Sequence, residues 1–476
     1  MINHKIYSKL SINIVLFLSF LFSISLSFHY LSKYDKLIKV ENTEGLIHPM
    51  LKSSPGNHWF EADEIINDIK NKKNFFEYGN DYDEFLPQRI VALYYYISGQ
   101  TIHDENGNFK TDNGKFLYLT LRTLLFYLTL IYFAHKITKI LPTKNCFFII
   151  LFLAIEPTIF QFHSSFFNES LFFPLQILLL AYFMSPPTNL FSNFFTGIIL
   201  GLMFSVSVES FYLIIPIILF QVLTFKKKSF KIIFSCIFGF MFVLSIITFH
   251  NYKRTNNIFF MNDGAKTALY LYIAPNILSI SKEISNDKAQ SIMNTQKFEW
   301  LKKNKINISL FKDKTFMHIG LIDNEADRLK YYNYLQYTAF NIIIKNPLST
   351  VKFMFKKNLH TLVLNPFFIK NYHKFDTVNG KLAYYKSETH TNEIPYRIAY
   401  TIVLYIIMLI GIFCSLKNIN NILSFSLLIL AIYPVFVVGW MGANRYFVPS
   451  LIYLSIFFGN GMACILSRKI LKTKLE

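Results

Sequence analysis

The chain has 476 residues, of which 53% are hydrophobic and 18% aromatic, and its formal net charge is +19. Several runs reach the roughly 20 apolar residues that a helix needs to cross a bilayer. This composition excludes a water-soluble globular protein and predicts an all-α polytopic membrane protein.

About ten transmembrane helices are predicted. The first follows Lys5 and Lys9 and lacks a clear small-residue cleavage site, which predicts an uncleaved signal anchor. The ten ranges are 11–31, 116–135, 145–163, 167–185, 191–208, 209–225, 230–250, 396–415, 421–440 and 444–467.

Lysines and arginines in the short connections predict the orientation. If both termini lie in the cytoplasm, the basic connections all fall on that side, as the positive-inside rule requires. They contain Lys136, Lys139, Lys144, Lys226, Lys227, Lys228, Lys231, Lys417, Arg468, Lys469, Lys472 and Lys474. The positive charge is then expected to meet lipid headgroups and not nucleic acid.

In this orientation two long segments, 32–115 and 251–395, lie outside. The chain therefore divides into a membrane region 1–250 that includes the first outer loop, a basic outer loop region 251–395, and a C-terminal membrane region 396–476. Residues 251–325 are weakly patterned. Helices are predicted over 327–344 and 348–363, broken at Asn346-Pro347, and the second has an apolar face suited to a membrane or to the protein's own outer surface.

The first outer loop contains a short amphipathic helix. Ala62, Ile65, Ile66 and Ile69 recur at i, i+3, i+4 and i+7 and so share one face. This face is predicted to dock onto the membrane domain.

Two acids border that face. At 100° per residue, Glu61 and Asp63 lie on its opposite shoulders, while Glu64 and Asp68 point away from it. A carboxylate on such a shoulder is only partly in water, which is how the pKa of a general base is tuned. The alternative interpretation is that all four acids form a solvated face.

Ionisable residues inside the predicted spans gather in their outer halves. Because such groups are costly at membrane depth, each is a functional candidate. A transporter of charged solutes would be expected to place them near the midplane, often on interrupted helices. An enzyme at the outer interface would place them where they are found. They are Arg122, Glu156, His163, Glu169, Glu209, Arg397 and Arg445.

Glu169 and Arg445 each open a predicted span. Glu169 could complement the helix dipole or hold a substrate hydroxyl or a partner arginine. Arg445, beside Asn444 and Tyr446, suits bidentate capture of a phosphate at headgroup level. The alternative for Arg445 is an interfacial arginine that snorkels to the membrane surface.

No metal site or cofactor is predicted. His58 with Glu61, and His163 with Glu169, could in principle contribute to a divalent-ion site, but the chain contains no HExxH and no Gly-rich phosphate loop. The cysteines lie far apart within or beside spans and are interpreted as small apolar residues. They are Cys146, Cys236, Cys414 and Cys464.

Four stretches carry a family resemblance: the first-loop helix followed by FLPQRIVALYYYISG, NESLFFPLQILLLAYF, AFNIIIKNPLSTVKFMF and NRYFVPSLIYLSIFFGNGMA. With the membrane layout, they resemble the bacterial polytopic glycosyltransferases of the GT-C superfamily, most of all the dolichyl-phosphate-mannose-protein mannosyltransferase-like group that includes the aminoarabinose lipid A transferases. The resemblance covers the whole membrane layout.

This resemblance implies transfer of a sugar from a polyprenyl-phosphate carrier to an acceptor on the outer face, with a first-loop carboxylate as the base. The family usually has Asp or Asp-Glu before an aromatic residue and the helix. Here the segment reads GNHWFEADE, with Asn57 where an acid is expected, so Asp63 and Glu61 are rival candidates.

The implied mechanism is an inverting displacement. Arg445, helped by Arg89 or Arg122, would neutralise the departing phosphate, and Glu169 and His163 would line the sugar or lipid-phosphate pocket. His58, Asn444 and Tyr446 complete the predicted substrate contacts.

The predicted partners are membrane lipid, a polyprenyl-phosphate sugar donor, and a glycan, lipid or protein acceptor. The predicted location is the bacterial cytoplasmic membrane, with the active site on its outer face. A transporter or flippase of lipid-linked saccharides is the alternative function, and a non-catalytic membrane scaffold is a third.

Overall fold

The computed structural model describes residues 9–44, 62, 65–72, 85–100, 113–163, 169–256, 258, 269–306, 325–364, 376–378, 381–383, 394–418, 421–438 and 447–472. These residues are largely helical. The exception is an antiparallel hairpin of β1 (Asp376–Val378) and β2 (Lys381–Ala383), in which Thr377 lies opposite Leu382.

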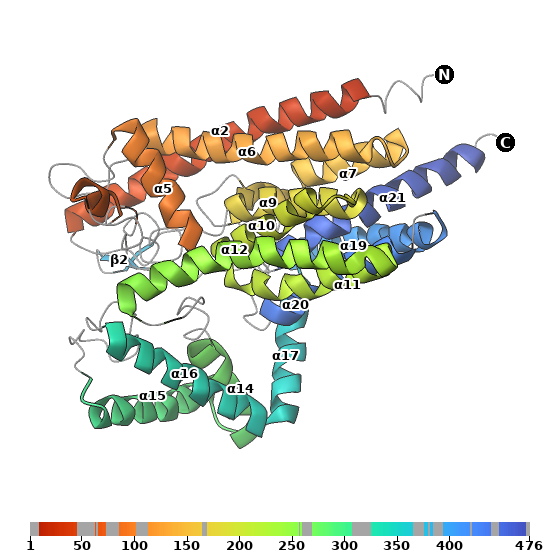
Figure 1. Cartoon of the computed structure of the whole chain (residues 1–476). Helices are drawn as coiled ribbons and strands as arrows, with labels where there is room; N and C mark the ends of the chain where they lie inside the picture. Colours follow the sequence, from red (N-terminus) through yellow and green to blue (C-terminus); the bar gives the residue numbers. More distant parts are fainter. Residues whose placement is uncertain are drawn as a thin grey trace.

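Long helices running roughly side by side form the membrane bundle (Figure 1). Each predicted span coincides with one of them or, for 145–163 and 209–225, with two consecutive helices. The bundle comprises α2 (Lys9–Glu44), α6 (Asn113–Ile137), α7 (Thr143–Ile155), α8 (Pro157–His163), α9 (Glu169–Met184), α10 (Leu190–Val206), η2 (Val208–Leu213), α11 (Ile214–Phe225), η3 (Lys226–Lys228), α12 (Ser229–Thr255), α19 (Ile394–Asn418), α20 (Asn421–Val438) and α21 (Val448–Lys472).

Several segments of this bundle are long and apolar enough to cross a membrane. Shorter apolar helices at 143–155, 170–184, 190–206 and 421–434 lie among them, so the exact number of spans is not fixed. The all-α polytopic class predicted from the sequence is confirmed. The long segments are Leu10–Phe28, Phe116–Ile137, Ser210–Lys253, Ile394–Leu416 and Val448–Ser467.

The two ends of the bundle differ. α2 begins and α21 ends at one end, where η3 and the α6–α7 connection also lie (Figure 1). Lys139 and Lys226–Lys228 are exposed there, and we call it the basic end. The opposite end, which we call the loop end, carries α8, the start of α6 and α5 (Phe85–Ser98). This arrangement agrees with the predicted position of both termini on one side.

The predicted span 145–163 is not one continuous helix, and that prediction is wrong. It breaks at Glu156, whose φ of −57° and ψ of 121° end α7, and α8 begins at Pro157. A proline disfavours helical geometry in the residue before it, which explains the break.

Small residues allow close helix packing in the bundle. A Cβ atom added to Gly411 of α19 would overlap the carbonyl oxygen of Phe457 on α21, and one added to Gly461 of α21 would overlap that of Ile407. Such contacts suit a membrane, where close van der Waals packing replaces the hydrophobic driving force between helices.

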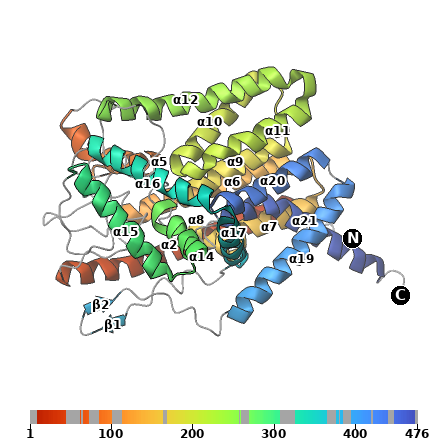
Figure 2. The same ribbon diagram turned by 90° about the horizontal axis from the view of Figure 1, so that it is seen from below.

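A separate group of helices, which we call the side lobe, lies beside the loop end (Figures 1 and 2). It comprises η4 (Leu269–Ile273), α14 (Ala274–Lys282), α15 (Asn286–Lys303), α16 (Glu325–Lys345) and α17 (Pro347–Leu362). The predicted pair of helices broken at Asn346-Pro347 is confirmed as α16 and α17. The sequence predicted no structure for η4, α14 or α15.

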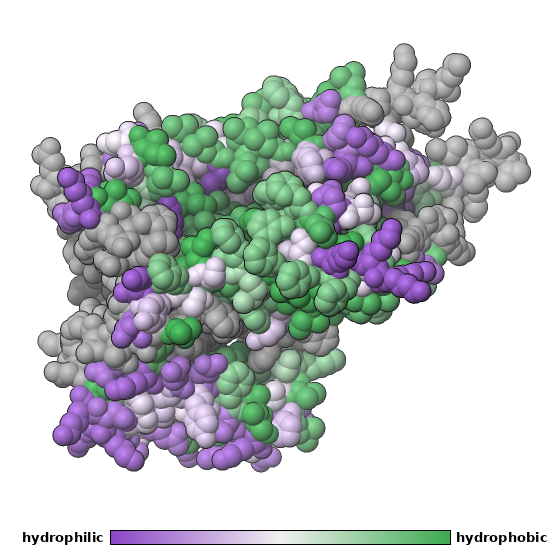
Figure 3. All heavy atoms as spheres, in the orientation of Figure 1, coloured by the Kyte–Doolittle hydropathy of each residue, from purple (hydrophilic) through white to green (hydrophobic). Residues whose placement is uncertain are grey.

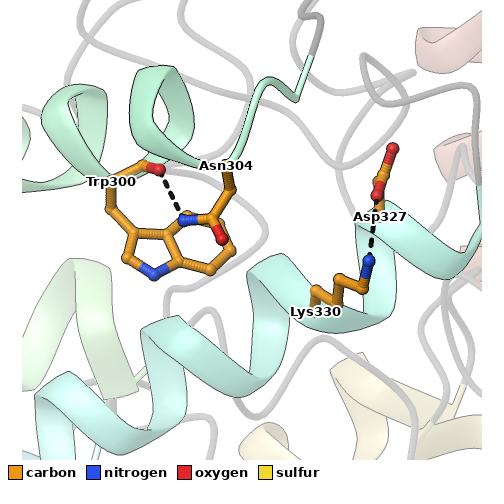
Figure 4. A network of polar contacts seen from close by, with 4 residues as sticks. All are labelled: Trp300, Asn304, Asp327 and Lys330. Carbon is orange, nitrogen blue, oxygen red and sulfur yellow. Dashed lines mark hydrogen bonds and ion pairs between the residues drawn. The ribbon is translucent and has the colours of Figure 1, made fainter.

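The side lobe has its own apolar core and a hydrophilic outer surface (Figure 3). The indole of Trp300 stacks on Tyr334 at 4.4 Å between ring centroids, which joins α15 to α16. At the end of α15 the Asn304 amide donates to the Trp300 carbonyl (2.8 Å), and on α16 Lys330 pairs with Asp327 (Figure 4). The lobe is therefore a folded unit outside the bundle.

Candidate active site

The predicted site residues divide between described and undescribed parts of the chain. Glu169 begins α9, but its side chain is not described. Arg89, Arg122 and His163 have described side chains. Outside the described residues lie His58, Glu61, Asp63, Asn444, Arg445 and Tyr446.

The first-loop helix docks through its predicted apolar face. Ala62, Ile65 and Ile66 are buried and Ile69 is half-buried, in a cluster shared with α5 and α6. Residues 65–70 are helical. The α5 and α6 side chains in this cluster are Val91, Ala92, Tyr95, Tyr118 and Leu119. The prediction that this face packs on the membrane domain is confirmed.

Arg122 lies on α6 next to this docking surface. Its guanidinium lies 5.2 Å from the ring centroid of Tyr118, which belongs to the cluster with Ala62 and Ile65. Arg122 is only 6% exposed. Residues four apart on a helix share a face. α6 therefore holds a buried cation about one turn from the point where the first-loop helix packs.

One further turn along the same face of α6, Phe126 stacks on His163, with ring centroids 4.1 Å apart and planes 11° apart. Tyr127 and Phe160 meet the same imidazole edge-on, at 5.8 and 5.2 Å. His163 ends α8 and is buried in this aromatic cage. The structure thus brings Arg122 and His163 to neighbouring turns of α6.

Arg89 contacts α12. Its Nη2 donates to Nε2 of His250 (2.9 Å), and its Nη1 donates to the Phe85 carbonyl (2.8 Å). The guanidinium also lies 3.6 Å from the centroid of the Phe85 ring. Because arginine can only donate, the His250 Nε2 accepts and carries no proton in this arrangement. Arg89 therefore ties α5 to α12.

Glu156 is a buried carboxylate at the α7–α8 break, 3% exposed. Its Oε1 accepts from the Thr158 hydroxyl (2.8 Å) and the Tyr400 hydroxyl (2.6 Å), and its Oε2 accepts from the Ile159 backbone N–H (2.7 Å). Glu156 therefore caps α8 and fastens it to α19.

Sequence reasoning missed the partners that hold these groups. Tyr118, four residues before Arg122 in one helix, could have been found from helical spacing. His250 could have been noticed as a polar residue at the end of an apolar run. No signal points to Tyr400, which lies 244 residues from Glu156.

The geometry gathers ionisable groups at the loop end of the bundle. Among the described residues, no group of three or more His, Cys, Asp or Glu side chains could hold a metal ion. A buried arginine beside a docked acidic helix can bind an anion, and a carboxylate on that helix can accept a proton.

No protein-family model matches the chain, and no curated protein sequence matches it. Similar solved structures include the archaeal oligosaccharyltransferase AglB from Archaeoglobus fulgidus in complex with an inhibitory peptide and a dolichol phosphate. That structure has 13% identity and a TM-score of 0.43, covering 88% of this chain and 47% of that one.

A second is the A. fulgidus oligosaccharyltransferase tethered through a disulfide to an acceptor peptide containing the NVT sequon. It has 13% identity and a TM-score of 0.43, covering 99% of this chain and 51% of that one. The chain spans about half the length of each of these structures.

Proposed function

We propose that the chain is a membrane glycosyltransferase that moves a sugar from a polyprenyl-phosphate carrier to an acceptor at the loop end. One observation carries the proposal: the first-loop helix packs its apolar face on α5 and α6 beside buried Arg122. A helix rich in acids and a buried cation are thereby brought to the membrane boundary, where a lipid phosphate is found. The family resemblance of the sequence supports the same reaction.

Asp63, or Glu61, is proposed to act as the general base. Asp63 lies between Ala62 and Ile65 in the sequence, and both of these side chains are buried against α5 and α6. The base takes the proton of the acceptor hydroxyl while the hydroxyl oxygen attacks the anomeric carbon. The bond from that carbon to the phosphate oxygen breaks, and the configuration inverts.

The leaving group is the polyprenyl phosphate, which departs with the bonding electron pair. Arg445 and Arg122 are proposed to stabilise its growing negative charge, which needs donors placed beforehand in a water-poor site. His163 and Glu169 are proposed to line the sugar pocket with Asn444, Tyr446 and His58. Arg89, which contacts His250 and Phe85, is proposed to orient α5 and to help stabilise the charge on the phosphate.

The partners in this proposal are a lipid-linked sugar donor, membrane lipid and a glycan, lipid or protein acceptor. The reaction as proposed uses no cofactor, because the phosphate is already a good leaving group and positioned cations suffice. The active site is proposed to face the outer side of the cell membrane, opposite the basic end.

The test is transfer from radiolabelled polyprenyl-phosphate sugars to extracted envelope acceptors by the purified, reconstituted chain. Asp63→Asn or Glu61→Gln is expected to slow turnover by more than about a hundredfold, the scale of a lost general base. Asp68→Asn, on the same helix, is the matched control and is expected to keep normal turnover. Normal rates in both single variants and in the double variant, with the protein correctly inserted, would overturn the mechanism.

A flippase of lipid-linked saccharides is the second candidate, because Glu156 is a buried acid at a helix break inside a predicted span. Its bonds to Thr158, Ile159 and Tyr400 favour a structural role. The two functions separate in proteoliposomes. Movement of the lipid-linked saccharide across the bilayer with no new glycosidic bond would favour the flippase, and product formation on one face would favour the transferase.

A further inference from the structure

α17 lies across the bundle. Figure 1 shows it at a steep angle to bundle helices such as α12, and Figure 2, turned by 90°, shows it nearly end-on. Because the bundle helices cross the membrane, a helix roughly perpendicular to them runs along the membrane plane.

The end of α17 is fastened to α19. The Thr401 hydroxyl accepts from the Leu364 backbone N–H (3.1 Å), and the Tyr405 hydroxyl donates to the Leu362 carbonyl (2.5 Å). Thr401 and Tyr405 lie within the apolar segment Ile394–Leu416. At 1.5 Å per residue they are roughly 10 and 16 Å along α19 from its first residue. α17 therefore meets α19 within the half of this apolar segment that lies nearer the loop end, and not above the membrane.

The start of α17 is fixed as well. Thr350 donates its hydroxyl to the carbonyls of Ile343 (3.1 Å) and Asn346 (2.9 Å), which locks the junction with α16. Phe353 is buried with Ile273 and Ile277 of the side lobe. One side of α17 thus packs against the rest of the side lobe.

The opposite side of α17 carries large apolar side chains that are exposed. Leu348, Val351 and Phe355 are 69%, 62% and 69% exposed and lie within about 60° of one another around the helix. On α16, which α17 follows in the chain, Tyr337, Phe340 and Ile344 are exposed as well. We call these six side chains the apolar strip. Large apolar side chains exposed together in this way mark an interaction site.

Lysines border the apolar strip. Lys345, Lys352 and Lys356 are exposed, and the two on α17 lie to one side of Leu348 around the helix axis. Figure 3 shows apolar side chains on the α17 edge of the lobe, whereas the rest of its visible surface is largely hydrophilic. An apolar face with a basic border is the pattern of a helix lying in a membrane interface.

We propose that the apolar strip rests in the leaflet at the loop end of the same membrane that the bundle spans, with Lys345, Lys352 and Lys356 at anionic lipid headgroups. The occupant of this surface is the bilayer, because α17 is attached to the loop-end half of the apolar segment of α19 and runs along the membrane plane. The surface is therefore continuous with the lipid-facing surface of the bundle. The contact holds the side lobe at a fixed height, and it does not rest on the proposed transferase activity.

The test places a bimane fluorophore at Val351→Cys or Phe355→Cys in the full chain, reconstituted at one copy per nanodisc. Gln290→Cys on α15, exposed on the lobe, is the matched control. The background replaces Cys414 and Cys464 by alanine, because these thiols are partly exposed while Cys146 and Cys236 are buried. Brominated lipids are expected to quench the labels at 351 and 355 severalfold more than the label at 290. Equal quenching at all three positions would overturn the proposal.

The role of charge is tested with Lys352→Glu combined with Lys356→Glu. In discs containing phosphatidylglycerol, the double variant is expected to lose about half or more of the quenching at position 351. In discs of phosphatidylcholine alone, the variant and the unchanged chain are expected to match. Unchanged quenching by the double variant in the anionic discs would overturn the assignment of headgroup contacts.

A second copy of the chain is the competing occupant. If the label at 351 is shielded from aqueous iodide only when two chains share a disc, the apolar strip is an interface between copies and the membrane proposal fails. Shielding at one chain per disc, with lipid quenching, supports it.

Discussion

The two ends of the bundle both bury polar side chains, but of different kinds. At the basic end the polar groups are amides and hydroxyls paired across helices. Asn145 of α7 donates to Asn460 of α21 (2.6 Å), and Asn460 donates to Ser415 of α19 (2.7 Å). At the loop end the buried polar groups include ionisable side chains, namely Arg122, Glu156 and His163.

A second neutral network strengthens the contrast. Near the basic end, Gln221 of α11 donates to the Tyr182 hydroxyl (2.8 Å), and that hydroxyl donates to Asn193 of α10 (3.0 Å). Neutral interhelical hydrogen bonds are a common means of holding membrane helices together. Buried charges cost far more, so a chain keeps them chiefly where they do chemistry. The comparison therefore assigns packing to the basic end and agrees with the chemistry proposed for the loop end.

Arg122→Gln should have the largest effect and would sharpen the comparison. Removing one preorganised donor to a developing anion typically costs about 10²–10³ in rate, so transfer is expected to fall by that factor. Lys136→Gln, at the basic end of the same helix, is the matched control and should leave transfer unchanged. The measurement is single-turnover transfer in proteoliposomes. Loss of activity in both variants, or in neither, would break the comparison.

Much of the bundle was predictable from the sequence, because long apolar runs and the 3.6-residue period are local signals. The first-loop helix shows this well. The spacing of Ala62, Ile65 and Ile66 predicted the face that docks, although not the surface that receives it. The break at Glu156 was missed, because apolarity over 145–163 outweighed the effect of Pro157 on the preceding residue.

The candidate site was only partly predictable. Depth along a span identified Arg122 and Glu156 as unusual, since an ionisable residue in an apolar run stands out. Their partners depend on helices far apart in the chain, as with Tyr400 and Glu156, and no local pattern encodes such contacts. The apolar face of α17 that contains Val351 and Phe355 was predicted from the sequence, whereas the exposure of this face and the burial of Phe353 against the rest of the lobe depended on how α17 packs.

Gly461→Ala tests the packing assigned to the bundle interior and should have the next largest effect. The new Cβ would overlap the Ile407 carbonyl, so α19 and α21 must separate. Overpacking of this kind costs about 1–3 kcal/mol, and we expect about 2 kcal/mol of lost unfolding free energy. Titration with sodium dodecyl sulfate in mixed micelles, followed by circular dichroism, measures it. Leu409→Met, on the exposed side of α19, should change stability by under about 0.5 kcal/mol.

Lys297 tests whether a buried cation is costly outside the membrane too. It is buried on α15, its Nζ donates to the Asn294 side-chain oxygen (2.9 Å), and burial lowers its pKa from 10.5 to about 8. Below pH 8 both folded and unfolded chains hold the proton, so the full cost of burial is present. Between pH 8 and 10.5 the unfolded chain binds more protons, and stability rises with pH.

Lys297→Met is therefore expected to stabilise the side lobe by about 1–2 kcal/mol at pH 7, and the gain should shrink as pH rises above 8. Burial raises the pKa of Tyr270 and Tyr331, so above about pH 10 the unfolded chain loses these protons more readily and the tyrosines destabilise the folded state. The effect of Lys297 is therefore measured between pH 8 and 10. Thermal unfolding followed by Trp300 fluorescence, with Trp59 and Trp440 replaced by phenylalanine, measures the difference from the chain with Lys297 retained. Exposed Lys288→Met on the same helix is the control. A gain that stays constant with pH would contradict the argument.

Asn460→Ala should have the smallest effect and most directly challenges the comparison. The substitution removes the hydrogen bonds that Asn460 makes with the Asn145 amide and the Ser415 hydroxyl. Interhelical hydrogen bonds in membranes are worth about 0.6–1.7 kcal/mol. We therefore expect the unfolding free energy to fall by about 1 kcal/mol in the same detergent titration. Transfer by the folded variant should stay normal. Ser467→Ala, which removes the exposed bond from Lys144, should cost under about 0.5 kcal/mol. If Asn460→Ala instead slowed transfer as much as Arg122→Gln while leaving stability intact, the two ends of the bundle could not be divided between packing and chemistry.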